Sequence, residues 1–138
     1  MRITVETTIA APIDLVWQAF NDPDDILKWD ASEEWRTISA SNDLKVGGLL
    51  ELRIEPRHDG TAFDFVATYT AVEPMRLIEW RTGDNLVARV EFNEIDAGVV
   101  VHQTFDAEPT TPIDEQRCEW QGVLDSFARH VMASNVCR

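Results

Sequence analysis

The chain has 138 residues, of which 25 are acidic and 12 are Lys or Arg, giving a formal net charge of −13. This length predicts a single domain, residues 1–138, with a substantial core. The negative charge repels nucleic-acid phosphates and anionic lipid surfaces, so we expect neither nucleic acid nor membrane as a partner. The sequence shows no apolar run of membrane-spanning length and no leader-like segment, so we expect a soluble, cytoplasmic protein.

The first 30 residues predict a strand followed by two short helices. Residues 3–9 are rich in β-branched side chains, which favour a strand. From Pro12 to Phe20, apolar residues recur at helical spacing along one face. Asn21–Asp22–Pro23 interrupts this pattern, and residues 24–28 predict a second short helix with acids in its favourable first turn.

The middle of the chain predicts antiparallel strands that alternate between an apolar and a polar face. Turns rich in Asp and Gly separate these strands, which we expect at residues 35–40, 49–55, 61–72, 76–80, 88–93 and 99–105. Within residues 61–72, the odd positions from Phe63 to Ala71 form the more aromatic face. The predicted architecture is a curved antiparallel sheet of about six strands.

A long amphipathic helix is predicted from Pro112 to about Asn135, because its apolar residues keep helical spacing. About six turns, roughly 36 Å, are enough to cross a whole sheet. On this helix Cys118 and Cys137 would be roughly 28 Å apart, too far for a disulfide, so we expect free thiols. Together the elements predict an α+β domain whose helices lie on one side of the sheet and enclose a cavity.

The chain resembles the START/Bet v 1-like superfamily, and more narrowly the single-domain proteins similar to the C-terminal domain of the Hsp90 ATPase activator. The matching motifs are I-x-A-P-x-x-x-V-W at Ile9–Trp17, D-P-x-x-I-x-x-W at Asp22–Trp29, D-x-x-V-G-G at Asp43–Gly48, F-x-A-x-Y at Phe65–Tyr69, Val72–Glu73–Pro74 with Arg76–Leu77, and the helix Trp120–Val131. The resemblance implies the helix-grip fold. Its implied functions range from ligand carriers to cyclases, aromatase-like enzymes and a chaperone cofactor.

A ligand would contact the concave face of the sheet and the inner face of the last helix. Strand alternation and helix spacing, with the family arrangement for the first two tryptophans, predict these ligand-binding residues: Trp29, Trp35, Leu52, Ile54, Phe63, Phe65, Tyr69, Ile78, Trp80, Phe92, Gln103, Phe105, Trp120, Leu124 and Phe127. The same residues would also suit a filled core. The excess of aromatic rings favours a real cavity, because flat rings line pockets for flat guests.

Few polar groups are expected inside. The amide of Gln103 must find a strand group, the Tyr69 hydroxyl or a ligand. His58, His102 and His130 are expected in a turn, on the convex face and near the end of the last helix, so they do not converge. The sequence therefore predicts no metal site and no cofactor, and it identifies no catalytic residue.

Three functions fit this sequence, in a definite order. We first expect the binding of an apolar or aromatic small molecule in the internal cavity. The second is a cyclase- or hydratase-like enzyme that polarises a carbonyl through Tyr69, Gln103 or a carboxylate at the mouth. The third is an Hsp90-type co-chaperone, for which the partner is a chaperone, and a second copy of the chain is the remaining alternative partner.

Overall fold

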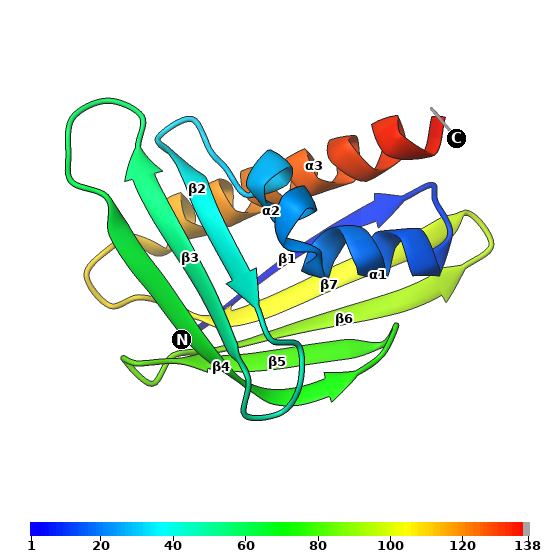
Figure 1. The fold of residues 1–138 in the computed structure, drawn as a ribbon, viewed down its shortest axis with the longest axis horizontal. Coiled ribbons are helices and arrows are strands. Elements are labelled where there is room, and N and C mark those ends of the chain that lie inside the picture. The colour runs from blue at the N-terminus through cyan, green and yellow to red at the C-terminus, as the bar shows by residue number, and fades with distance from the viewer. Residues whose placement is uncertain (137–138) are drawn as a thin grey trace.

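A seven-stranded antiparallel sheet curves around one long helix, as Figure 1 shows. The computed structural model describes residues 1–136. The strands are β1 (Arg2–Ile9), β2 (Trp35–Asn42), β3 (Leu49–Pro56), β4 (Phe63–Glu73), β5 (Leu77–Thr82), β6 (Val87–Ile95) and β7 (Gly98–Asp106). The helices are α1 (Ile13–Asn21), α2 (Pro23–Trp29) and α3 (Ile113–Val136). The sequence predicted about six strands, and the count rises because β1 joins the same sheet.

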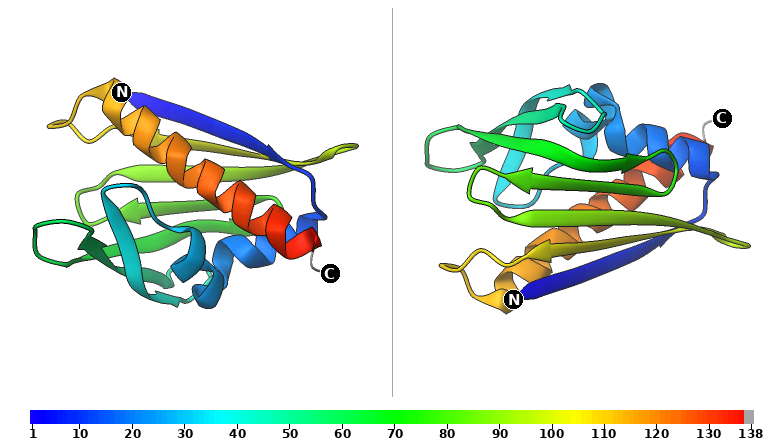
Figure 2. Two further views of the ribbon diagram at one scale, coloured as in Figure 1. Left: turned by 90° about the horizontal axis from the view of Figure 1, so that it is seen from above. Right: turned by 90° about the horizontal axis from the view of Figure 1, so that it is seen from below.

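The sheet order is β1-β7-β6-β5-β4-β3-β2, so each strand from β2 to β6 pairs with the next along the chain. β1 pairs antiparallel with β7 over its whole length, from Arg2 opposite Asp106 to Ile9 opposite Val99. α3 lies diagonally across the concave face, and α1 and α2 lie beside its C-terminal half (Figure 2). The predicted α+β class and helix-grip arrangement are confirmed.

A β-bulge in β4 changes which side chains face inward. Tyr69 lies opposite Trp80, but the next pairs are Ala71 with Glu79 and Val72 with Ile78. Beyond this register shift, the even-numbered residues of β4 face the core in place of the odd-numbered ones. The expectation that Ala71 continues the aromatic face is therefore wrong, and Val72 packs against the core instead.

Aromatic rings fill the end of the concave face that α1 and α2 cover. The Phe20 ring centroid lies 5.2 Å from that of Trp29, 5.4 Å from Phe92 and 5.2 Å from Phe127. The last two contacts are edge-to-face, which is a favoured geometry for packed rings. The buried indole N–H of Trp29 donates to the carbonyl of Ala19 at 2.8 Å, which ties α2 to α1. This end of the molecule is a packed core.

Within residues 1–136, no helix is both long and apolar enough to cross a bilayer. Cys118 is exposed on α3 and is a free thiol in this part of the chain. The expectation for Cys137 concerns a residue outside the described range.

Candidate functional site

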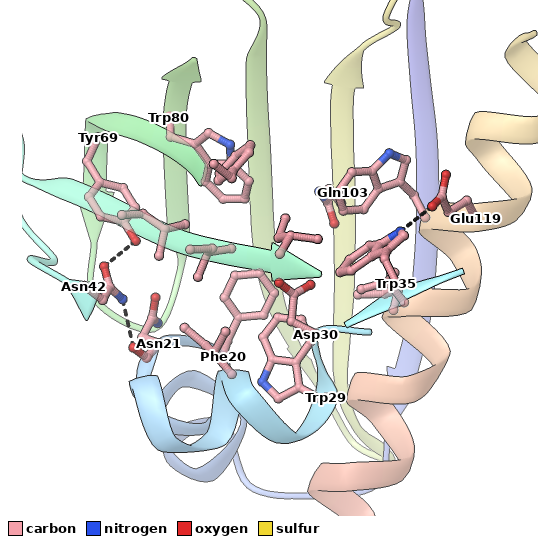
Figure 3. A pocket seen from close by; sticks show the side chains of 18 of the residues that line it. Phe20, Asn21, Trp29, Asp30, Trp35, Asn42, Tyr69, Trp80, Gln103 and Glu119 are labelled. Carbon is pink, nitrogen blue, oxygen red and sulfur yellow. Dashed lines mark hydrogen bonds between the residues drawn. The ribbon is translucent and has the colours of Figure 1, made fainter. Parts of the chain in front are cut away.

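A cavity of about 220 Å³ lies between the concave side of β3–β5 and the first half of α3. α2 and the start of β2 close one side of it, and Figure 3 shows the side chains that surround it. Its wall consists mainly of aliphatic and aromatic groups. A pocket of this kind holds an apolar guest through burial of apolar surface.

Most of the residues that the sequence placed at a ligand site come together on this wall. They are Trp29, Trp35, Leu52, Ile54, Phe63, Phe65, Tyr69, Trp80, Gln103, Trp120 and Leu124. Leu50, which alternates with Leu52 on β3, lies there too. Phe63 is largely exposed and stands at the rim, whereas Leu52, Ile54 and Tyr69 are buried.

The other four expected ligand-binding residues lie in the packed core. Phe92 and Phe127 contact Phe20 in the aromatic cluster described above. Ile78 is fully buried between Val72 and Val90 on the neighbouring strands. The Phe105 ring packs 5.7 Å from that of Trp120, behind the cavity wall. Strand alternation places Ile78, Phe92 and Phe105 on the concave side, and helical spacing places Phe127 on the inner face of α3. At these positions the sheet and the helices pack directly against each other and leave no space.

The remaining wall residues were not predicted, and they are Phe20, Asn21, Ile26, Asp30, Asn42, Glu119 and Val123. Phe20 and Val123 do lie on the apolar faces that helical spacing identified, so a signal for them was present. The polar members lie at or just beyond the ends of α1, α2 and β2, or on the side of α3 next to its apolar face. Periodicity carries no information on whether such positions face a cavity.

Asp30 is the one carboxylic acid buried in this wall, with 7% of its surface exposed. It follows α2 directly, and its backbone carbonyl accepts from the Thr37 N–H of β2 at 3.2 Å. The Thr37 hydroxyl donates to the Asp30 Oδ2 atom at 2.9 Å. Burial raises the pKa of Asp30 from 3.8 to about 6, and the hydrogen bond from Thr37 offsets only part of that effect.

The second oxygen of the Asp30 carboxyl faces the open space of the cavity. Thr37 is its only hydrogen-bonding side chain among residues 1–136. Over the same residues, no side-chain oxygen or nitrogen is both fully buried and unpaired. An oxygen that lacks a partner must therefore reach accessible space, and in Figure 3 the carboxyl points into the hollow.

Gln103 carries a second unpaired polar group. Its residue is 8% exposed, and its neighbours across β1 and β6 are Val5 and Val90, whose side chains offer no hydrogen bond. No side-chain hydrogen bond of this amide occurs within residues 1–136, in contrast to the other buried glutamine, Gln116. The sequence led us to expect that the Gln103 amide bonds a neighbouring strand group, the Tyr69 hydroxyl or a ligand. Neither of the two hydrogen bonds within the protein is present among the described residues.

At the other end of the cavity, the polar groups satisfy one another. The Tyr69 hydroxyl donates to the Asn42 side-chain oxygen at 2.6 Å, and the Asn42 amide donates to the Asn21 carbonyl at 2.8 Å. Burial raises the pKa of Tyr69 above its ordinary value, more than the bond to Asn42 lowers it. The hydroxyl stays protonated at physiological pH and is committed as a donor.

Trp35 and Glu119 join β2 to α3 at the side of the cavity. The Trp35 indole N–H donates to the Glu119 carboxylate (Figure 3). The Trp35 ring lies 6.4 Å from that of Trp120. Both partners are half-buried. This contact closes the cavity between a strand and a helix that are 84 positions apart in the chain.

The histidines do not contribute to the cavity wall. His58 lies in the exposed β3–β4 connection, and His102 contacts Glu6 of β1 at 3.0 Å. His130 on α3 contacts Asp25 of α2 at 2.8 Å, an ion pair or hydrogen bond that holds these helices together. Among the described residues, no group of three His, Cys, Asp or Glu side chains is arranged to hold a metal ion.

A curved antiparallel sheet closed by a C-terminal helix over an internal hollow defines a protein of the helix-grip class. The chain belongs to the Activator of Hsp90 ATPase homolog 1-like protein family, whose model matches residues 10–132. The expected family is thereby confirmed. Among curated proteins, none matches this chain.

Solved structures show the same fold along nearly the whole chain. The AHSA1-like protein from Aeromonas hydrophila is 37% identical with a TM-score of 0.88, covering 97% of this chain and 94% of its own. A Cytophaga hutchinsonii protein is 36% identical with a TM-score of 0.83, covering 96% and 93%. A Chromobacterium violaceum protein shares the fold at 21% identity, with a TM-score of 0.86 and coverage of 96% and 98%.

Proposed function

We propose that the protein binds a small, largely apolar molecule that carries an aromatic ring, in the cavity between β3–β5 and α3. The observation that carries this proposal is the hollow itself, which persists among buried aliphatic and aromatic side chains. Protein interiors are otherwise packed to the density of organic crystals, so a space of this size has a cost in lost contacts. A bound ligand would restore those contacts.

The volume limits the size of the ligand. An apolar cavity of about 150 Å³ accepts benzene, and this one measures about 220 Å³. The guest is therefore an aromatic ring with a short substituent, or two fused rings, of roughly ten non-hydrogen atoms. At about 0.5 kcal/mol per atom, such a ligand would bind with a Kd near 1 mM or somewhat lower before any polar contact.

The test uses 2-phenylethanol, a neutral and soluble compound of this size, followed by isothermal titration calorimetry. We expect saturable binding with one site per chain. The matched variant is Val123→Phe, which adds a ring to the cavity wall and should abolish that binding. The absence of binding to the wild-type protein, or equal binding to both proteins, would contradict the proposal. Recovery of unchanged alcohol after long incubation separates a binding protein from an enzyme that converts it.

A second candidate function follows from family membership, whose description names an activator of the Hsp90 ATPase. On this alternative the outer surface would contact the chaperone and the cavity would be incidental. The ATPase rate of purified Hsp90, measured with and without this protein, distinguishes the chaperone role from ligand binding. A rise in ATPase rate that Val123→Phe leaves unchanged would support the chaperone role, and a flat rate would remove it.

A further inference from the structure

We propose that the natural ligand is a cation, a protonated amine attached to the aromatic group, and that its ammonium binds the carboxylate of Asp30. This inference rests on the proposed function, because it needs an occupied cavity. It concerns the chemical class of the ligand and assigns Asp30 as the residue that selects it.

Asp30 has no countercharge among residues 1–136. Its described side-chain partner, Thr37, is neutral. Over the part of the chain that the structure describes, the cavity wall contains no Lys, Arg or His. The cations nearest along the chain, Lys28 and Arg36, are exposed, and Arg36 pairs with Glu55 at 3.6 Å. A buried carboxylate without a cation is costly, and it is usually paired when it is retained. A cationic ligand would supply the missing charge.

Aromatic side chains line the cavity beside this carboxylate. Trp29 and Trp35 lie at the end of the cavity where Asp30 is found, as Figure 3 shows. Trp120 also lines the cavity, with its ring 6.4 Å from that of Trp35. The faces of indole rings attract cations, and tryptophan is the strongest of the aromatic side chains in this respect. A carboxylate among indole rings therefore suits an ammonium group better than it suits a neutral donor.

The same site disfavours anions. The titratable groups on the wall are Asp30, Glu119 and Tyr69, and none of them is basic. The whole chain carries a formal charge of −13, which concentrates cations near it and repels carboxylates. Fatty acids and aromatic acids would meet an uncompensated negative charge inside the cavity. The Gln103 amide oxygen, unpaired within residues 1–136, is available as an additional acceptor for an ammonium N–H.

The experiment compares three probes that differ in charge: 2-phenylethylamine, 2-phenylethanol and phenylacetate. The amine and the alcohol contain the same number of non-hydrogen atoms. Calorimetry at pH 7.5 with the wild-type protein should show the amine binding about tenfold more tightly than the alcohol, and phenylacetate binding least. Asp30→Asn should lower the ratio of amine to alcohol affinity to about one while alcohol binding persists.

Two control variants make the assignment specific. Asp96→Asn removes one negative charge from the exposed β6–β7 turn, and Glu119→Gln removes the other carboxylate of the wall. Asp96→Asn should leave the affinities for all three probes unchanged, and Glu119→Gln tests the competing assignment to the other carboxylate of the wall. If Glu119→Gln abolishes the preference and Asp30→Asn does not, the assignment to Asp30 is overturned.

The outcomes separate this inference from the proposed function. Equal affinity for the amine and the alcohol in the wild-type protein overturns the inference and leaves the binding function standing. Failure of all three probes to bind overturns both. Alcohol binding by Asp30→Asn verifies that the variant folds, and its amide side chain can still accept the hydrogen bond from Thr37.

Discussion

The hydroxyl of Thr37 on β2 donates a 2.9 Å hydrogen bond to the carboxylate of Asp30, which directly follows α2. This bond fixes one carboxyl oxygen and leaves the other facing the cavity. The pair therefore connects a helix to a strand and supplies one of the polar groups of a mainly apolar wall. Several predictions about stability and binding depend on this arrangement.

Asp30→Asn should stabilise the free protein at neutral pH. Burial raises the pKa of Asp30 to about 6 in the folded protein, above its value in the unfolded chain. Folding is therefore favoured by this group below about pH 4, and that advantage is lost as the pH rises through 6. At pH 7 the variant should gain up to about 3 kcal/mol in free energy of unfolding, and below pH 4 the gain should vanish. Urea unfolding from pH 3.5 to 7.5 measures the gain at neutral pH and its disappearance at low pH.

Asp96→Asn provides the reference for that series, because its carboxylate is exposed in a turn. Its free energy of unfolding should follow the wild-type value at every pH. If Asp30→Asn destabilises the protein at pH 7, the carboxylate has a compensating partner and the site described above is incorrect.

Binding of 2-phenylethylamine should depend on pH through the same group. The titratable residues of the wall are Asp30, Glu119 and Tyr69, and only Asp30 is buried with a pKa raised to about 6. Above that pH the carboxylate is ionised, so the affinity for the ammonium should be constant up to about pH 9, near which the amine itself begins to lose its proton. Below pH 6 the affinity should fall by about tenfold in all, down to the affinity that Asp30→Asn has for the amine. Calorimetry with Asp30→Asn should give a flat profile over the acidic range.

Two valines on α3 distinguish a hollow from a packed core. Val123 lines the cavity and is 4% exposed, whereas Val131 is fully buried outside the cavity wall. Val123→Phe should change the free energy of unfolding by less than about 1 kcal/mol, since the ring can enter empty space. Val131→Phe should cost about 2–3 kcal/mol by overpacking. Equal losses, measured by chemical denaturation, would show that the space near Val123 is filled.

Two buried glutamines form another matched pair. Gln103 has no side-chain hydrogen bond within residues 1–136, whereas the Gln116 side chain bonds Glu108 and Thr111 at 2.7–2.8 Å. Gln103→Leu should leave stability within about 0.5 kcal/mol of wild type or raise it, because no bond is lost. Gln116→Leu should cost about 2–4 kcal/mol, because it leaves backbone groups unpaired. A comparable cost at Gln103 would reveal a partner inside the protein.

The sequence predicted the parts of this site that follow simple periodicity. Leu52 and Ile54 alternate along β3, and Trp120 and Leu124 are four apart on α3, so their shared faces were visible in the pattern. The pattern could not separate them from Phe92 or Phe127. Phe92 on β6 and Phe127 on α3 also point into the space between the sheet and the helix. Phe20 of α1 packs against both rings and fills that end of the space.

The polar groups of the site were beyond prediction for a different reason. Asp30 and Asn42 lie where α2 and β2 end, and their orientation depends on contacts with Thr37 and Tyr69 that only the fold creates. The bulge after Tyr69 likewise shifts the inward phase of β4 without any proline or glycine to mark it. Local sequence determines an element's faces, but tertiary packing decides which part of a face stays open.

The most direct measurement is a ¹H–¹⁵N NMR titration that follows the indole N–H signals of the five tryptophans. Trp29, Trp35, Trp80 and Trp120 line the cavity, whereas Trp17 packs against Phe92 outside it. Addition of 2-phenylethanol should shift the four cavity signals along one saturation curve and leave the Trp17 signal in place. If none of the four signals shifts, or if all five shift together without saturation, no ligand enters the cavity and the proposed binding function is contradicted.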